Sequence, residues 1–87
     1  MCTYITHKVD VEGSAKGGSG WFQTNEASVY LDHPVHAPYA HSLNIDFLNQ
    51  TMGPSFRVAV ELNPKDAVRL AHAILETVEE FNDLVEQ

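Results

Sequence analysis

The sequence has one cysteine, Cys2, so no disulfide can form within a single chain. Basic residues are also scarce: five Lys and Arg stand against twelve Asp and Glu, the net charge is −7, and no two basic residues are adjacent. Nucleic acids and anionic membrane surfaces are bound through clustered positive charge, so we expect neither as a partner. The first residues lack the apolar core of a signal peptide, which predicts a cytoplasmic protein.

The chain is also short, with 87 residues, which is enough for one small domain and too few for separate catalytic and regulatory domains. Hydrophobic residues make up 44% and charged residues 20%, a balance typical of a globular protein. Four of the five glycines lie between residues 13 and 20 and predict a flexible hairpin loop. A phosphate-binding loop requires a helix directly after it, whereas an extended run begins at Trp21, so no nucleotide cofactor is expected.

Alternation of apolar and polar residues predicts four β-strands, at about residues 3–12, 21–33, 41–48 and 55–62. The short turns between them favour an antiparallel meander. A helix is predicted at about residues 64–85, because Asn63 is a good cap and Pro64 fits the first helical position. The expected fold is therefore α+β, a four-stranded meander packed by one C-terminal helix (ββββα), in a single domain spanning residues 1–87.

The predicted helix has one apolar stripe that can lie across the sheet: Ala67, Ala71, Ile74, Val78, Phe81 and Val85. Its last turns are acidic, which opposes the helix dipole and suits either solvent or the cations of a partner. A single helix covers one face of a sheet. Tyr4, Trp21 or Phe22, and Tyr30 are expected to add apolar area to the other face, so a homodimer through that face or through a sheet edge is predicted.

Histidines are concentrated in one segment, where His33, His36 and His41 lie within nine residues. Imidazole is the commonest protein ligand for transition metals. If the flanking strands pair, His33 and His41 lie near each other across the ladder, in phase with the face under the helix. Three imidazoles with an open position suit zinc, iron, copper or nickel, and His7 or Cys2 would complete the set.

Several alternatives to a metal site stay open. Asp32 and Asp46 could orient a ligand, although their phase points to the opposite face. The histidines could instead be structural residues of a metal-free, dimeric interaction protein. They could also serve a metal-free acid/base enzyme or a pocket for a small-molecule ligand. Cys2 would become a terminal nucleophile if Met1 were removed, and His72 lies off the apolar stripe and is expected to face solvent.

Five segments carry a resemblance to a known family: Met-Cys-Thr-Tyr-Ile-Thr at 1–6, Gly-Trp-Phe at 20–22, Asp-His-Pro-Val-His-Ala-Pro at 32–38, Leu-Asn-Ile-Asp-Phe at 43–47 and Arg-Val-Ala-Val-Glu-Leu at 57–62. In these segments the chain resembles small bacterial, often actinobacterial, proteins of about 90 residues built around an Asp-His-Pro-x-His segment. The resemblance implies a bacterial source and no particular activity. We therefore expect a small protein that binds a transition metal at the 33–41 turn, and the sequence does not decide whether it is an enzyme.

Overall fold

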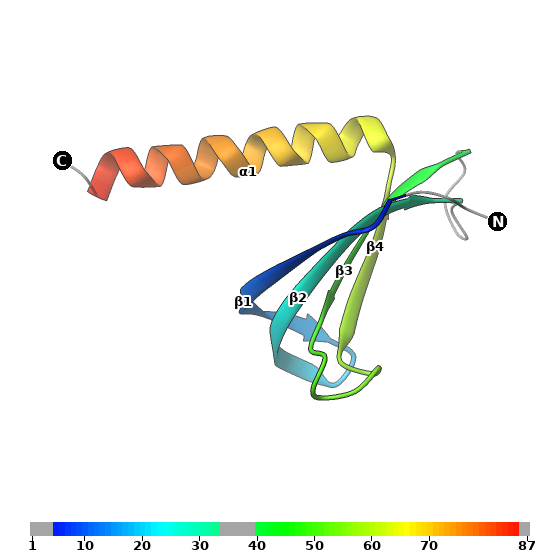
Figure 1. The fold of residues 1–87 in the computed structure, drawn as a ribbon. Coiled ribbons are helices and arrows are strands. Elements are labelled where there is room, and N and C mark those ends of the chain that lie inside the picture. The colour runs from blue at the N-terminus through cyan, green and yellow to red at the C-terminus, as the bar shows by residue number, and fades with distance from the viewer. Residues whose placement is uncertain (1–4, 34–39, 86–87) are drawn as a thin grey trace.

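The computed structural model describes residues 5–33 and 40–85. Its elements are the strands β1 (His7–Gly17), β2 (Gly20–Asp32), β3 (Ser42–Leu48) and β4 (Arg57–Leu62), followed by the helix α1 (Pro64–Val85). The strands form one antiparallel sheet in the order β1-β2-β3-β4, and α1 leaves from one end of β4 (Figure 1). The predicted four-stranded meander with a C-terminal helix is confirmed.

The glycine-rich segment is mainly strand, although the sequence predicts a loop there. Pairing continues beyond a bulge between Asp10 and Gly13 up to the pair Gly17 and Gly20, so only two residues form the turn. A side chain at residue 17 would come within 3.3 Å of the Phe22 ring. Glycine lowers strand propensity locally, yet here it makes room for an aromatic residue on the paired strand.

The strand register gives the sheet two different faces. Side chains alternate between the faces of a sheet, so residues directly paired across strands share a face. The apolar face consists of three cross-strand rows: Ala27, Phe47 and Val58; Val29, Ile45 and Val60; Leu31, Leu43 and Leu62. The polar face has the opposite phase and carries Tyr30, Asp32, Asn44, Asp46, Arg57 and Glu61. Of the residues expected to add apolar area to the second face, Phe22 and Tyr30 have the phase of the polar face and Trp21 has the phase of the apolar face, while Tyr4 lies outside the described residues.

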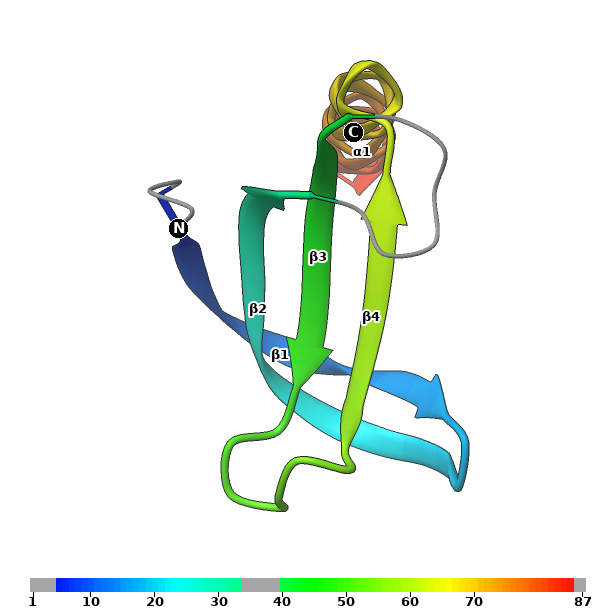
Figure 2. The same ribbon diagram turned by 90° about the vertical axis from the view of Figure 1, so that its right-hand side faces the viewer.

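The sheet is strongly curled at the end away from α1. The far half of the β1–β2 hairpin turns across the sheet toward β4 (Figure 2), and the two edge strands β1 and β4 come into contact. There the Phe22 ring meets Phe56 edge to face, with ring centroids 5.7 Å apart. Bulges increase the local twist of a strand pair, and the bulge in β1 lies where this bend begins.

The helix begins as the sequence predicts. The Asn63 side-chain oxygen accepts a hydrogen bond from the amide of Lys65 at 2.9 Å, and its carbonyl accepts from the amides of Asp66 and Ala67. Only the first half of α1 lies over the sheet, and the rest extends away from it (Figure 1). Of the predicted stripe, Ala67, Ala71 and Ile74 line a groove shared with the sheet, and Val78 and Phe81 are not part of its lining. Within the described ranges, no helix is long and apolar enough to cross a membrane.

Candidate functional site

The ends of β2 and β3 bring two of the predicted histidines together. Asp32 pairs with Ser42 as the last pair of the ladder, and His33 and His41 are the next residue on either side. Their ring centroids are 5.2 Å apart and the ring planes are tilted by 33°. The juxtaposition predicted from the sequence is thus present in the structure.

His33 is held in place by its neighbours. Its backbone amide donates to Oδ1 of Asp32 at 2.7 Å, and its ring Nδ1 lies 3.2 Å from the carbonyl oxygen of Ala40. A carbonyl oxygen can only accept a hydrogen bond, so Nδ1 carries the proton in the neutral ring. Nε2 then has the free lone pair, which is the form of imidazole that binds a metal ion.

Of the other predicted ligands, the structure describes only His7, which does not lie beside this pair. His7 pairs with Val29 of β2, and Val29 precedes His33 by four residues, or about 13 Å along the strand. His72 is exposed on α1, as predicted. His36 and Cys2 lie outside the described residues. Among the residues that the structure describes, no three His, Cys, Asp or Glu side chains form a group that could hold a metal ion.

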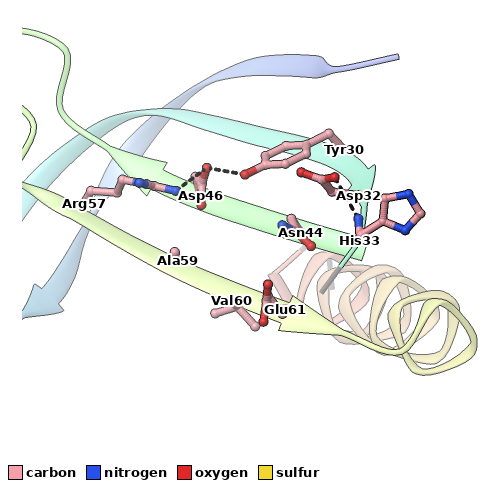
Figure 3. A pocket seen from close by; sticks show the side chains of 9 residues that line it. All are labelled: Tyr30, Asp32, His33, Asn44, Asp46, Arg57, Ala59, Val60 and Glu61. Carbon is pink, nitrogen blue, oxygen red and sulfur yellow. Dashed lines mark hydrogen bonds and ion pairs between the residues drawn. The ribbon is translucent and has the colours of Figure 1, made fainter. Parts of the chain in front are cut away.

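A hollow of about 410 Å³ lies on the polar face of the sheet, and His33 is part of its lining. Figure 3 shows its wall formed by Tyr30, Asn44, Asp46 and Arg57, with His33 at its rim. The groove on the helix side of the sheet is lined by apolar side chains instead. His33 therefore lies with the polar face and not under the helix, because β2 ends at Asp32 and strand alternation no longer fixes the next residue.

The Asp46 carboxylate organises the hollow. Its Oδ2 accepts from the Tyr30 hydroxyl at 3.1 Å and from the Arg57 guanidinium at 3.0 Å. The hydrogen bond to Asp46 and its negative charge raise the pKa of Arg57 above its ordinary value. Asp46 is thus engaged with Arg57 and Tyr30, and neither contact orients a histidine. About half of the surface of the Arg57 side chain stays in solvent.

Sequence reasoning missed the cluster of Tyr30, Asp46 and Arg57. All three have the phase of the polar face, but they are not directly opposite one another: Asp46 pairs with Ser28 and Ala59. Long side chains reach diagonal neighbours across a sheet. Alternation within the three strands places these residues on the same face of the sheet. Only the register of the strands shows that they are also close to one another.

The whole chain can be compared with known proteins, solved structures and protein families. No curated protein and no solved structure matches it. Residues 1–86 match the model of a family described as a family of unknown function, DUF6295. Since the match covers nearly every residue, the chain belongs to this family.

Proposed function

We propose that the protein binds a divalent transition metal ion at the turn between β2 and β3, with His33 and His41 as ligands. The observation that carries the proposal is the pair of imidazole rings, whose centroids are 5.2 Å apart and whose planes are tilted by 33°. Two imidazoles that share a tetrahedral zinc ion at ordinary Zn–N distances have centroids about 5 Å apart. The pair thus has the spacing that such coordination requires.

The contact between His33 and Ala40 supports the same proposal. Histidines that bind metals usually donate their second ring N–H to a carbonyl or carboxylate, which fixes the tautomer and the ring orientation. The Nδ1 of His33 has such a carbonyl partner at 3.2 Å. Two ligands alone do not make a site. The sequence predicts His36 as the third ligand and His7 or Cys2 to complete the set, and of these two Cys2 is the one proposed, because the register places His7 at a different level of the sheet.

The test is metal binding by the untagged full chain, measured by calorimetry with Zn²⁺ and by the visible absorption of added Co²⁺. We expect one ion per chain and at least tenfold weaker binding in His33→Ala and His41→Ala. His72→Ala is the matched control, because it removes an exposed histidine from α1. Absence of binding would contradict the proposal. Equal binding in all three variants would also contradict it, because the metal would then bind somewhere other than His33 and His41.

The remaining ligands are identified by the same titration. His36→Ala and Cys2→Ser each test one predicted ligand, and His7→Ala tests a residue that the register places at a different level of the sheet. We expect loss of affinity in His36→Ala and none in His7→Ala. A tetrahedral Co²⁺ spectrum that persists in both His36→Ala and Cys2→Ser would mean that water or another group completes the site.

A second candidate function rests on the hollow itself: binding of a small molecule without a metal. The specific observation is that Asp46 fixes the Arg57 guanidinium in the wall of the hollow while half of that side chain stays accessible. A ligand with a carboxylate or phosphate would suit those remaining donors. Ligand-induced stabilisation that survives a chelator and disappears in Arg57→Met would favour this candidate over the metal site.

A further inference from the structure

The distribution of buried residues is the reverse of that in a typical domain. Among the described residues, only two hydrophobic side chains are buried, Phe22 and Ala27. Six polar residues are buried, and they are Thr24, Glu26, Ser28, Ser42, Asp46 and Asn49. Large apolar side chains on both the sheet and the helix remain exposed. The described part of a single chain therefore has little of the hydrophobic core that stabilises folded domains.

The shape of the chain points the same way. Its accessible surface is 6856 Å², which exceeds by roughly 1,700 Å² the area expected for a folded monomer of 9.7 kDa. Its radius of gyration is 14.9 Å, against about 12 Å for a compact domain of this length. The helix that extends away from the sheet accounts for the open shape (Figure 1).

Part of the exposed apolar area lines one groove. The groove has a volume of about 450 Å³ and lies between α1 and the apolar face. Its two walls are apolar: Leu31, Leu43 and Ile45 from the sheet, and Ala67, Ala71 and Ile74 from the helix. An occupant of this groove must therefore present apolar side chains to two walls at once.

The second half of α1 has that property. Helical residues are spaced 100° apart, so its apolar arc from Leu75 through Val78 and Phe81 to Leu84 is about 180° wide. Val78 is 51% exposed and Phe81 is 60% exposed. The described acidic residues of this half are Glu76, Glu79, Glu80 and Asp83, and all have the opposite phase. They would stay in water when the apolar arc is covered.

We infer that the groove is filled by a second copy of this chain, and that each copy places the second half of its α1 against the groove of the other. A two-fold axis makes this contact reciprocal, which is the usual geometry of a homodimer. The excess surface of the two chains together, roughly 3,400 Å², falls within the range buried by obligate homodimers. This interface is distinct from the sheet edge and from the polar face, and it requires no metal.

Charge also favours an apolar contact of this kind. Each chain carries a net charge of −7, so two copies repel each other at long range. The apolar face and the apolar arc of α1 keep the acidic side chains away from the contact. Added salt screens the repulsion and leaves the hydrophobic contact intact. We therefore expect the dimer to strengthen as the salt concentration rises.

The first test is the mass of the untagged full chain in solution, measured by sedimentation equilibrium over a hundredfold range of concentration. We expect a mass about twice 9.7 kDa throughout the micromolar range. A folded chain with the mass of a monomer over that range would overturn the inference. Binding of lipid vesicles or of an apolar dye by such a monomer would not rescue the inference, because the groove would then be filled by something other than a second copy.

The second test locates the interface. Val78→Asp and Phe81→Asp place a charge on the apolar arc, and we expect each to weaken the dimer at least a hundredfold. His72→Asp is the matched control, because it adds the same charge on the opposite side of the same helix, where the residue is exposed. A dimer that tolerates both arc variants as well as the control would place the interface elsewhere and overturn the proposed surface.

A third measurement covers the case in which the arc variants fail to fold. In mixtures of isotope-labelled and unlabelled wild-type chains, isotope-filtered NMR detects only contacts between copies. We expect contacts from the Phe81 ring of one copy to methyl groups of the apolar face of the other. If the wild-type dimer shows no such contacts, the interface lies elsewhere.

Discussion

The two faces of the sheet differ in chemistry and in exposure, and the polar face is the more deeply buried of the two, whereas most proteins bury the apolar face. On the polar face, Asp46 is only 7% exposed, whereas Val60 on the apolar face is 38% exposed. The polar face is complete within one chain: among the described residues, no buried side-chain nitrogen or oxygen lacks a hydrogen-bond partner. The apolar face is covered only in part, by the first half of α1, and the proposed dimer would cover the rest. In that proposal one face serves the chain itself and the other serves assembly.

The largest effect is expected where the chain does bury an aromatic residue. Phe22 is 7% exposed, and its neighbour Trp21, which points to the other face, is 71% exposed. Phe22→Ala removes a ring packed on Phe56 and should lower the free energy of unfolding by about 3 kcal/mol. Trp21→Ala is the control and should change it by less than about 0.5 kcal/mol. Urea denaturation at one fixed protein concentration compares them, and equal losses would show that Trp21 is covered.

A smaller effect is expected from the ion pair of the polar face. Arg57→Met leaves the buried carboxylate of Asp46 without its charged partner and should cost about 2 kcal/mol. Arg69→Met is the matched control, because the pair of Arg69 with Asp66 is exposed and longer, at 3.7 Å, and should contribute less than about 0.5 kcal/mol. Denaturation of both variants measures the difference, and similar losses would mean that solvent screens both pairs alike.

The pH dependence of the same pair follows from the raised pKa of Arg57. A base whose pKa is higher in the folded state contributes its full stabilisation below its ordinary pKa and loses it only as the pH rises through the folded value. The difference between wild type and Arg57→Met should therefore stay constant from neutral pH into the alkaline range. A difference that shrinks between pH 7 and 10 would show that another group controls it.

The smallest effect is expected on the acidic side of α1. The last turn of the helix contains no basic residue, and a positive charge there interacts favourably with the helix dipole. Asp83→Lys should raise the free energy of unfolding by about 0.5 kcal/mol and leave the mass in solution unchanged. Loss of the dimer in this variant would show that the acidic side takes part in the contact.

Much of the fold follows from local features of the sequence. Alternation in β2, β3 and β4 marks the strands, and the Asn63 cap followed by Pro64 marks the helix start. The glycine segment was assigned wrongly, because the pairing of Gly17 with Gly20 depends on contacts across the hairpin and not on propensity. An apolar stripe on a helix predicts that the stripe is covered. It does not show whether the cover comes from the same chain.

The candidate site was predictable only in part. The approach of His33 and His41 follows from the pairing of the strands on either side of the turn. Their position relative to the helix did not follow, since the alternation that was extended to His33 ends with β2 at Asp32. The link between Asp46 and Arg57 needs the register of β3 against β4, which no local pattern specifies.

The bulge in β1 has a consequence for solubility. A flat sheet with free edges can recruit further strands and grow into fibrils. Here the bulge between Asp10 and Gly13 interrupts the ladder along one edge strand, and the curled hairpin brings that strand into contact with the other edge. Both features disfavour the addition of further strands at the edges. The exposed apolar face is therefore combined with sheet edges that are poor templates for aggregation.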